Sequence, residues 1–164
     1  FELYGDVAFI EPEEYSENKS LKKVVIAVDT SGSCSGEVMN EFLRETKNLL
    51  QDISEIALFK EVILMQCDVE IQVEEHFQDI WEFPEENSWK MKGFGGTDFC
   101  PVFKRVEEIM EGEQEEVDFL VYFSDGYGRF PEKEPLYPVF FVLSEKDEEW
   151  ELPDWVMPIW YRNM

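Results

Sequence analysis

Apolar residues in the N-terminal half of the chain follow first a strand pattern and then a helix pattern. Residues 24–28 form a continuous run of β-branched and other apolar side chains that ends at Asp29. Such a run is typical of a central strand that is buried on both faces. Residues 38–53 then place apolar side chains three or four positions apart, which predicts an amphipathic helix with Ser35 as its N-cap.

The rest of the chain predicts further strands and one more helix. Residues 99–110 have the helical period, with Pro101 in the first turn and Gly112 at the end. The alternation at residues 69–73 predicts a half-buried strand, and the short connection after Cys67 makes it antiparallel to the strand before it. Apolar runs predict the other strands, at residues 61–67, 117–123, 139–143 and 156–161.

This order of elements predicts an α/β fold. We expect a Rossmann-like, open, mostly parallel twisted sheet with one antiparallel edge strand and helices on both faces. We assign this domain to residues 22–164. Residues 1–21 show no sustained period, and we expect them to be a lead-in or the tail of an upstream domain, since the sequence starts at Phe1 rather than at a methionine.

Three short polar loops carry hydroxyl and carboxylate groups. Their sequences are Asp29-Thr30-Ser31-Gly32-Ser33, Gly96-Thr97-Asp98 and Ser124-Asp125-Gly126. In an open α/β sheet, ligands bind outside the carboxyl ends of the strands, where neighbouring connections leave to opposite faces. We therefore expect strands 24–28 and 117–123 to be neighbours, and the three loops to converge at that point.

The side chains of these loops suit a divalent metal ion. Mg²⁺ takes six oxygen ligands, keeps several waters and is satisfied by one or two carboxylates together with hydroxyls. The candidate ligands are Asp29, Ser31, Ser33, Thr97 and Asp125. Each motif alone is common as a turn or a helix cap. The prediction therefore depends on their occurring together, in this order, at the ends of predicted elements.

The charge of the chain narrows the classes of partner. There are 38 Asp and Glu residues against 14 Lys and Arg, which gives a net charge of −24. Such a surface repels phosphate backbones and anionic lipid headgroups, and it attracts cations and basic surfaces. We therefore expect neither a nucleic acid nor a membrane as partner, and no apolar run approaches the roughly 20 residues of a membrane span.

Thiol and imidazole groups add little to the candidate chemistry. The three cysteines are too widely spaced for a zinc site or a disulfide framework, which favours a cytoplasmic location. Cys34 and Cys100 adjoin the metal loops. We interpret them as small buried residues at helix starts, with a redox role as the alternative. His76, the single histidine, has no nucleophile motif near it and is interpreted as a surface or strand-end residue.

The three loops together resemble a known metal site. The segments Asp29-Thr30-Ser31-Gly32-Ser33, Gly96-Thr97 and Asp125-Gly126 look like the metal-ion-dependent adhesion site of von Willebrand factor type A (VWA) domains. One branch is especially similar, namely the C-terminal VWA-like domain of bacterial and archaeal proteins described as predicted metal-dependent peptidases. That similarity covers about residues 22–162. It includes Cys67-Asp68, Gly95-Gly96-Thr97-Asp98-Phe99, Pro101-Val102-Phe103, and Ser124-Asp125-Gly126 before Phe130-Pro131.

The resemblance implies a VWA fold and a protein-binding module that depends on Mg²⁺ or Mn²⁺. In the family, two serines and a threonine ligate the metal, two aspartates often act through water, and a partner carboxylate fills the open position. Residue by residue, these roles fall to Asp29, Ser31, Ser33, Thr97 and Asp125. The resemblance also suggests an AAA+ ATPase as a partner. It places any peptidase chemistry in an upstream domain, because this sequence has no HExxH motif.

Other classes of function stay open at this stage. A metal-assisted hydrolase or phosphatase would use Asp29 beside Mg²⁺, but the sequence has no P-loop and no histidine near the motif. The chain could also be the non-catalytic C-terminal part of a metallopeptidase-like protein, or a purely structural domain that has lost its metal. An aspartic protease is excluded because its Asp-Thr-Gly turn is absent. We expect this fragment not to be an enzyme.

Overall fold

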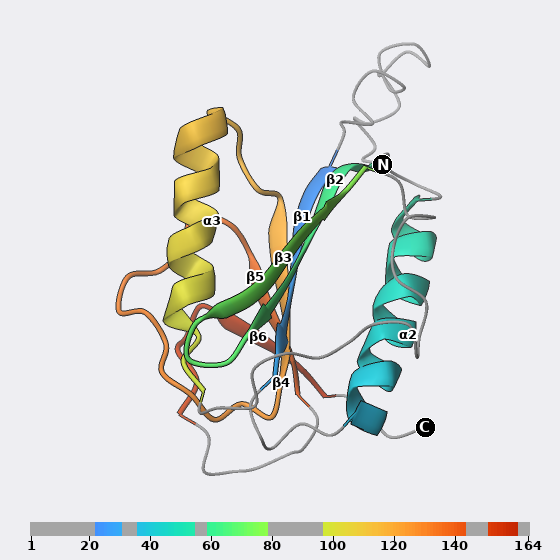
Figure 1. The fold of residues 1–164 in the computed structure, drawn as a ribbon. Coiled ribbons are helices and arrows are strands. Elements are labelled where there is room, and N and C mark those ends of the chain that lie inside the picture. The colour runs from blue at the N-terminus through green and yellow to red at the C-terminus, as the bar shows by residue number, and fades with distance from the viewer. Residues whose placement is uncertain (1–21, 31–35, 55–58, 79–96, 144–150, 161–164) are drawn as a thin grey trace, which may run out of the picture.

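The computed structural model describes residues 22–30, 36–54, 59–78, 97–143 and 151–160, with only the backbone at 36–39, 53, 54 and 59. Figure 1 shows a central sheet with helix α3 on one face and helix α2 on the other. The elements are β1 (Lys22–Asp29), α2 (Gly36–Ser54), β2 (Phe59–Cys67), β3 (Ile71–Phe77), α3 (Cys100–Glu113), β4 (Phe119–Ser124), β5 (Val139–Leu143) and β6 (Val156–Trp160). No described helix is long and apolar enough to cross a membrane.

The sheet has the strand order β3-β2-β1-β4-β5-β6. Strands β2, β1, β4, β5 and β6 are parallel to one another, and of the described strands only β3, at one edge, is antiparallel to its neighbour, β2. The predicted mostly parallel α/β sheet with one antiparallel edge strand is therefore confirmed. The expected adjacency of the first and fourth strands is also confirmed, since Val24–Val28 pair with Phe119–Phe123.

Alternate side chains of β1 enter two separate cores, one on each face of the sheet. Val25 and Ala27 belong to the core under α3, whereas Val24, Ile26 and Val28 belong to the core under α2. Helix α3 contributes Val102, Phe103, Val106 and Ile109, and α2 contributes Phe42, Leu43 and Leu50. Because helices cover both faces, every residue of the β1 run 24–28 is buried, as its continuous apolar pattern predicts.

The edge strand β3 begins later than its apolar alternation predicts. Val69 lies in the turn before it and is 54% exposed. The Asp68 carboxylate accepts hydrogen bonds from the Glu70 backbone N–H (3.1 Å) and the Gln72 side chain (3.0 Å). An aspartate that bonds the backbone two residues ahead stabilises a turn. The chain therefore turns at 68–70, and the strand starts at Ile71.

Helix α3 does not end at Gly112, where the sequence predicts its end. It continues to Glu113, and Gln114 adopts the left-handed conformation at its C-terminus (φ 54°, ψ 37°). After the helix, two hydrogen bonds between Asp118 and Lys23, both 2.8 Å long, hold the return to β4 against β1. The start is as predicted, with Pro101 in the first turn.

Helix α2 covers the predicted segment, but its buried stripe is narrower than the apolar pattern suggests. Phe42, Thr46 and Leu50 are buried, whereas Leu49 is 38% exposed. Ser35, its predicted N-cap, lies outside the described residues, as does the predicted lead-in 1–21.

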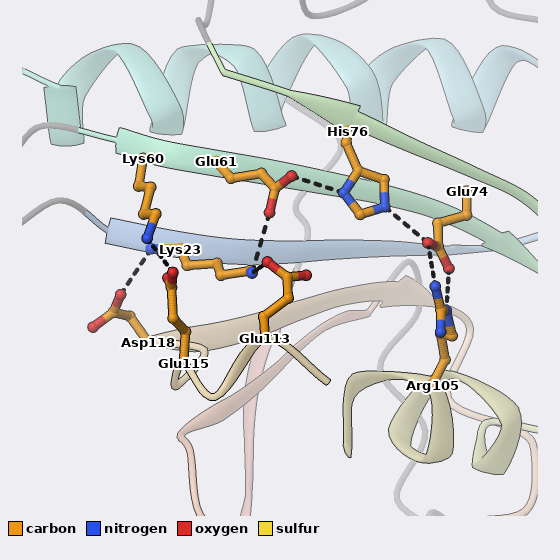
Figure 2. Close-up of polar contacts among 9 residues, drawn as sticks. All are labelled: Lys23, Lys60, Glu61, Glu74, His76, Arg105, Glu113, Glu115 and Asp118. Atoms are coloured by element: carbon orange, nitrogen blue, oxygen red, sulfur yellow. Dashed lines mark hydrogen bonds and ion pairs between the residues drawn. The ribbon is translucent and has the colours of Figure 1, made fainter. Parts of the chain in front are cut away.

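A line of charged side chains holds β3 to α3 (Figure 2). The ring nitrogens of His76 lie 2.8 Å from Glu61 and 2.8 Å from Glu74. Arg105 of α3 donates two hydrogen bonds to Glu74, at 2.7 and 3.0 Å. Only the imidazolium form can donate to both carboxylates at once. Partial burial lowers the pKa of His76, but its hydrogen bonds to Glu74 and Glu61 outweigh this effect and raise the pKa above 6.5.

The buried Lys23 extends this line to the other end of α3 (Figure 2). Its ammonium group lies 2.6 Å from Glu113 and 3.2 Å from Glu61, and the residue is only 2% exposed. A buried ammonium is tolerated when carboxylates pair with it. The start of β1, the start of β2 and the end of α3 are thus held together by one cation.

Candidate metal centre

The candidate site lies where β1 and β4 end side by side. Both strands run in the same direction, and Val28 pairs with Phe123, so Asp29 and Ser124 finish at the same edge of the sheet. Asp29 and Ser124 are fully buried, and Asp125 is 9% exposed. The expected convergence of the first and third loops is thus observed at residues 29 and 125.

Short hydrogen bonds within the Ser124–Tyr127 turn and from it hold the two aspartates of this edge. The Ser124 hydroxyl donates a 2.7 Å hydrogen bond to Asp29 and accepts one of 3.1 Å from the Gly126 N–H. Asp125 accepts a 3.0 Å bond from the Tyr127 N–H. The turn requires a positive φ of 93° at Gly126, a conformation that glycine adopts without steric cost. The Ser-Asp-Gly motif is therefore a turn whose polar groups fix the position of the Asp29 carboxylate.

The loop that carries Thr97 is joined to the same edge by backbone hydrogen bonds. Asp98 N–H donates to the Asp68 carbonyl at 2.9 Å, and Phe99 N–H donates to the Arg129 carbonyl at 3.0 Å. These two bonds connect the loop to the β2–β3 turn and to the segment after β4. Thr97 itself is half-buried.

Gly128 lies close to Phe99 and Thr97, and this contact holds the Thr97 loop against the segment after β4. A side-chain carbon at residue 128 would lie 2.7 Å from the Phe99 ring and 2.8 Å from the Thr97 methyl group. The Phe99 ring is fully buried, and its centroid lies 4.8–5.0 Å from three other aromatic rings. Those rings are Tyr122, Phe130 and Phe141. The loop after β4 can lie against Thr97 because residue 128 has no side chain.

The charge around the site is negative. Burial raises the pKa of the Cys67 thiol, at the end of β2, to about 12, and the carboxylates of Asp68, Asp29 and Asp98 also raise it. The negative charges of these three carboxylates therefore all influence the buried Cys67 sulfur at this edge. Placing like charges together in a buried region is unfavourable unless a cation compensates them.

Of the five predicted ligands, the structure describes Asp29, Thr97 and Asp125, all at the carboxyl edge of the sheet. Ser31 and Ser33 lie outside the described residues. In the described part of the chain, no group of three or more carboxylate, thiol or imidazole side chains is placed to hold a metal ion. The described donors are two carboxylates and one hydroxyl, which fits the oxygen ligands of Mg²⁺ or Mn²⁺ if the two serine hydroxyls complete the set. The role of all five residues as ligands stays a prediction.

Two residues of this edge were not assigned by sequence reasoning. Ser124 belongs to a noted motif, but its bond to Asp29 depends on the pairing of β1 with β4. The Thr30 hydroxyl is buried and has no hydrogen-bond partner in the part of the chain that the structure describes. Its position directly after Asp29 is the only signal in the sequence.

The Cys100 thiol lies beside this site, at the start of α3, and is half-buried rather than buried as expected. Burial raises its pKa, and the thiol donates a 3.6 Å hydrogen bond to the Arg129 carbonyl. This pKa direction does not support a redox role for Cys100, and Cys34 lies outside the described residues. His76 lies in β3, tied to two glutamates, as expected for a surface histidine of a strand.

Comparison with known families agrees with the fold. No curated protein matches the chain. A family profile described as a VWA-like domain (DUF2201) matches residues 24–159, which include all the described helices and strands except the outer ends of β1 and β6. The chain therefore belongs to this family of VWA-like domains.

Proposed function

We propose that this chain is a protein-binding module that binds Mg²⁺ or Mn²⁺ and uses the ion to hold a carboxylate of its partner. The observation that carries the proposal is the 2.7 Å bond from the Ser124 hydroxyl to Asp29, which ties that buried carboxylate to the strand end that Asp125 directly follows. Five residues would hold the ion: Asp29, Ser31, Ser33, Thr97 and Asp125.

Charge balance supports a partner carboxylate. The two aspartates offset the charge of a divalent ion, while the hydroxyls of serine and threonine add oxygen ligands without charge. Such an ion keeps an affinity for one more anionic oxygen. The chain carries a net charge of −24, so an unaccompanied acidic peptide would be repelled. We therefore propose a partner that presents one Asp or Glu framed by Lys and Arg, which also speed encounter.

The proposal assigns no catalytic residue to this chain. Its single histidine, in β3, pairs with Glu61 of β2 and Glu74 of β3 rather than lying beside a nucleophile, which supports a binding role over hydrolysis. We further propose that the domain works in the cytoplasm beside an AAA+ ATPase, the partner class that the motif resemblance suggests.

The experiment compares Thr97→Val with the wild-type domain. Valine keeps the shape of threonine and its contact with Gly128, and it removes only the hydroxyl. Mn²⁺ affinity, measured by titration calorimetry, should fall about tenfold, which corresponds to about 1.4 kcal/mol. Capture of a purified AAA+ candidate should be strong in Mg²⁺, weaker with Thr97→Val and absent with EDTA.

The control is Gln78→Ala, which removes an exposed, uncharged polar side chain just after β3, near the opposite edge of the sheet. It should bind metal and partner like the wild type. Equal Mn²⁺ affinity for all three proteins would refute the ligand set. Capture that persists in EDTA would show that the partner binds elsewhere.

A further inference from the structure

A groove runs along α3 on the side of the loop formed by residues 131–137. It consists of two hollows of about 320 and 270 Å³. Glu107, Pro135 and Tyr137 border both hollows, so the two are continuous. The larger hollow lies at the C-terminal end of α3, and the smaller one reaches Cys100 at its N-terminal end.

The larger hollow has an excess of negative charge. Five glutamates and one lysine, Lys133, line it. The glutamates are Glu107, Glu111, Glu115, Glu116 and Glu134. Glu115 is paired with Lys60. The carbonyl groups at the end of a helix add partial negative charge, and the last turn of α3 has no basic residue to offset it. A cationic group bound in this hollow would therefore meet charge from both side chains and backbone.

The groove also offers apolar contacts and one unused polar group. Leu136, at its border, is 94% exposed and therefore accessible for an apolar contact. The side chain of Tyr137 is buried, and its hydroxyl has no hydrogen-bond partner among the described residues. Burial, and to a smaller extent the charge of Glu107, raises the pKa of Tyr137, so the hydroxyl remains a potential donor at neutral pH.

We propose that this groove binds an extended basic segment of a partner protein. Lys or Arg side chains of the segment meet the glutamates, and an apolar side chain covers Leu136. Charge disfavours a second copy of this chain, which also carries −24. The described carboxylates are not grouped to hold a metal ion, so an extended cationic segment fits better than a divalent ion. This interaction does not depend on the metal centre proposed above.

The test uses a fluorescein-labelled peptide of alternating lysine and leucine, titrated with the whole domain and followed by fluorescence anisotropy. The groove variant is the double change Glu111→Gln and Glu134→Gln. Its control, Glu45→Gln with Asp52→Asn, removes the same charge from α2 on the opposite face (Figure 1). Exposed ion pairs contribute up to about 1 kcal/mol each. The groove variant should therefore bind about three- to tenfold more weakly, and the control less than about twofold.

Leu136→Ser provides a second variant that leaves the core untouched, because the side chain is exposed. It should weaken binding of the lysine–leucine peptide about threefold, and it should not affect a lysine–serine peptide. EDTA should leave all affinities unchanged, and melting temperatures should show that every variant is folded. Equal weakening by the groove and control variants would overturn the proposal, because it would indicate attraction to the whole acidic surface. If the domain self-associates and Leu136→Ser abolishes this, the proposal would also be overturned, because the groove would then bind a second copy of the chain.

Discussion

Single small side chains determine how the loops meet at the carboxyl edge of the sheet. The Ser124 hydroxyl links β4 to Asp29, and Gly126 allows the turn that presents Asp125. Gly128 leaves room for Phe99 and Thr97. At this scale a change of one carbon atom alters the packing, because protein interiors have few voids into which a neighbour can move.

Gly128→Ala should lower the free energy of unfolding by about 1–3 kcal/mol, the usual effect of overpacking. Its added carbon would lie 2.7 Å from the Phe99 ring, which is buried among other rings and cannot move away easily. Urea denaturation measures the change. The matched control is Gly112→Ala in α3, where the added carbon meets nothing within 4 Å. This control should stabilise the domain by up to about 1 kcal/mol, because alanine favours the helix. Equal stability of wild type and Gly128→Ala would contradict the close packing.

The edge strand β3 is held by a different kind of interaction from the central strands. It pairs with β2 on one side only, and none of its residues is fully buried. The ion pairs from His76 to Glu61 and from Glu74 to Arg105 compensate for this by linking β3 to β2 and α3. Such a link depends on pH, unlike the apolar packing of β1.

The contribution of His76 to stability should disappear as pH rises. Its pKa in the folded state is raised above the ordinary 6.5, so folding favours the imidazolium. The contribution is complete below pH 6.5 and is lost as pH rises through the folded pKa. Hydrogen bonds from Arg105, opposed by burial, lower the pKa of Glu74 below 4.5, so its contribution is complete above pH 4.5 and is lost on acidification. The link should therefore be strongest between pH 4.5 and 6.5.

The predicted pH dependence can be checked by urea denaturation of wild type and His76→Gln at pH 5.5 and pH 8.5. His76 is the only histidine, so few other groups titrate in this range. The variant should be less stable than wild type at pH 5.5, with a smaller difference at pH 8.5. The idea fails if the difference between the two proteins is the same at both pH values.

Negative charge dominates the whole molecule, and two buried aspartates, Asp29 and Asp125, lie at the carboxyl edge of the sheet. A net charge of −24 opposes compaction through self-repulsion. A divalent cation bound at the edge formed by Asp29 and Asp125 would reduce that repulsion and would bind the folded state selectively. Metal binding and folding stability should therefore be linked.

Mg²⁺ or Mn²⁺ at about 100 times its dissociation constant should stabilise the fold by about 2.7 kcal/mol. For a chain of this size, that is a rise in melting temperature of roughly 5–10 °C. Asp29→Asn should abolish the rise, because the amide loses the charge but keeps an oxygen that can accept from Ser124. The control Asp52→Asn, an exposed residue of α2, should retain it. Identical melting curves in metal and in chelator, at matched ionic strength, would argue against the metal centre.

The fold class and the order of the motifs can be predicted from the residue pattern alone. The continuous apolar run 24–28 predicts a strand covered on both sides, because successive side chains of a strand point to opposite faces, and all five residues are buried. The motifs around Asp29, Thr97 and Asp125 lie at the ends of elements that the apolar pattern already predicts. Local periodicity and local turn chemistry suffice for such features, since both depend on neighbours within a few residues.

Which of these groups come into contact depends on how distant segments pair in the folded chain. The bond from Ser124 to Asp29 joins residues 95 positions apart, and the pair forms because β1 and β4 are adjacent and in register. The approach of Gly128 to Phe99 likewise depends on a distant partner. No local pattern records such contacts, because their energy comes from packing and pairing between segments that the sequence separates.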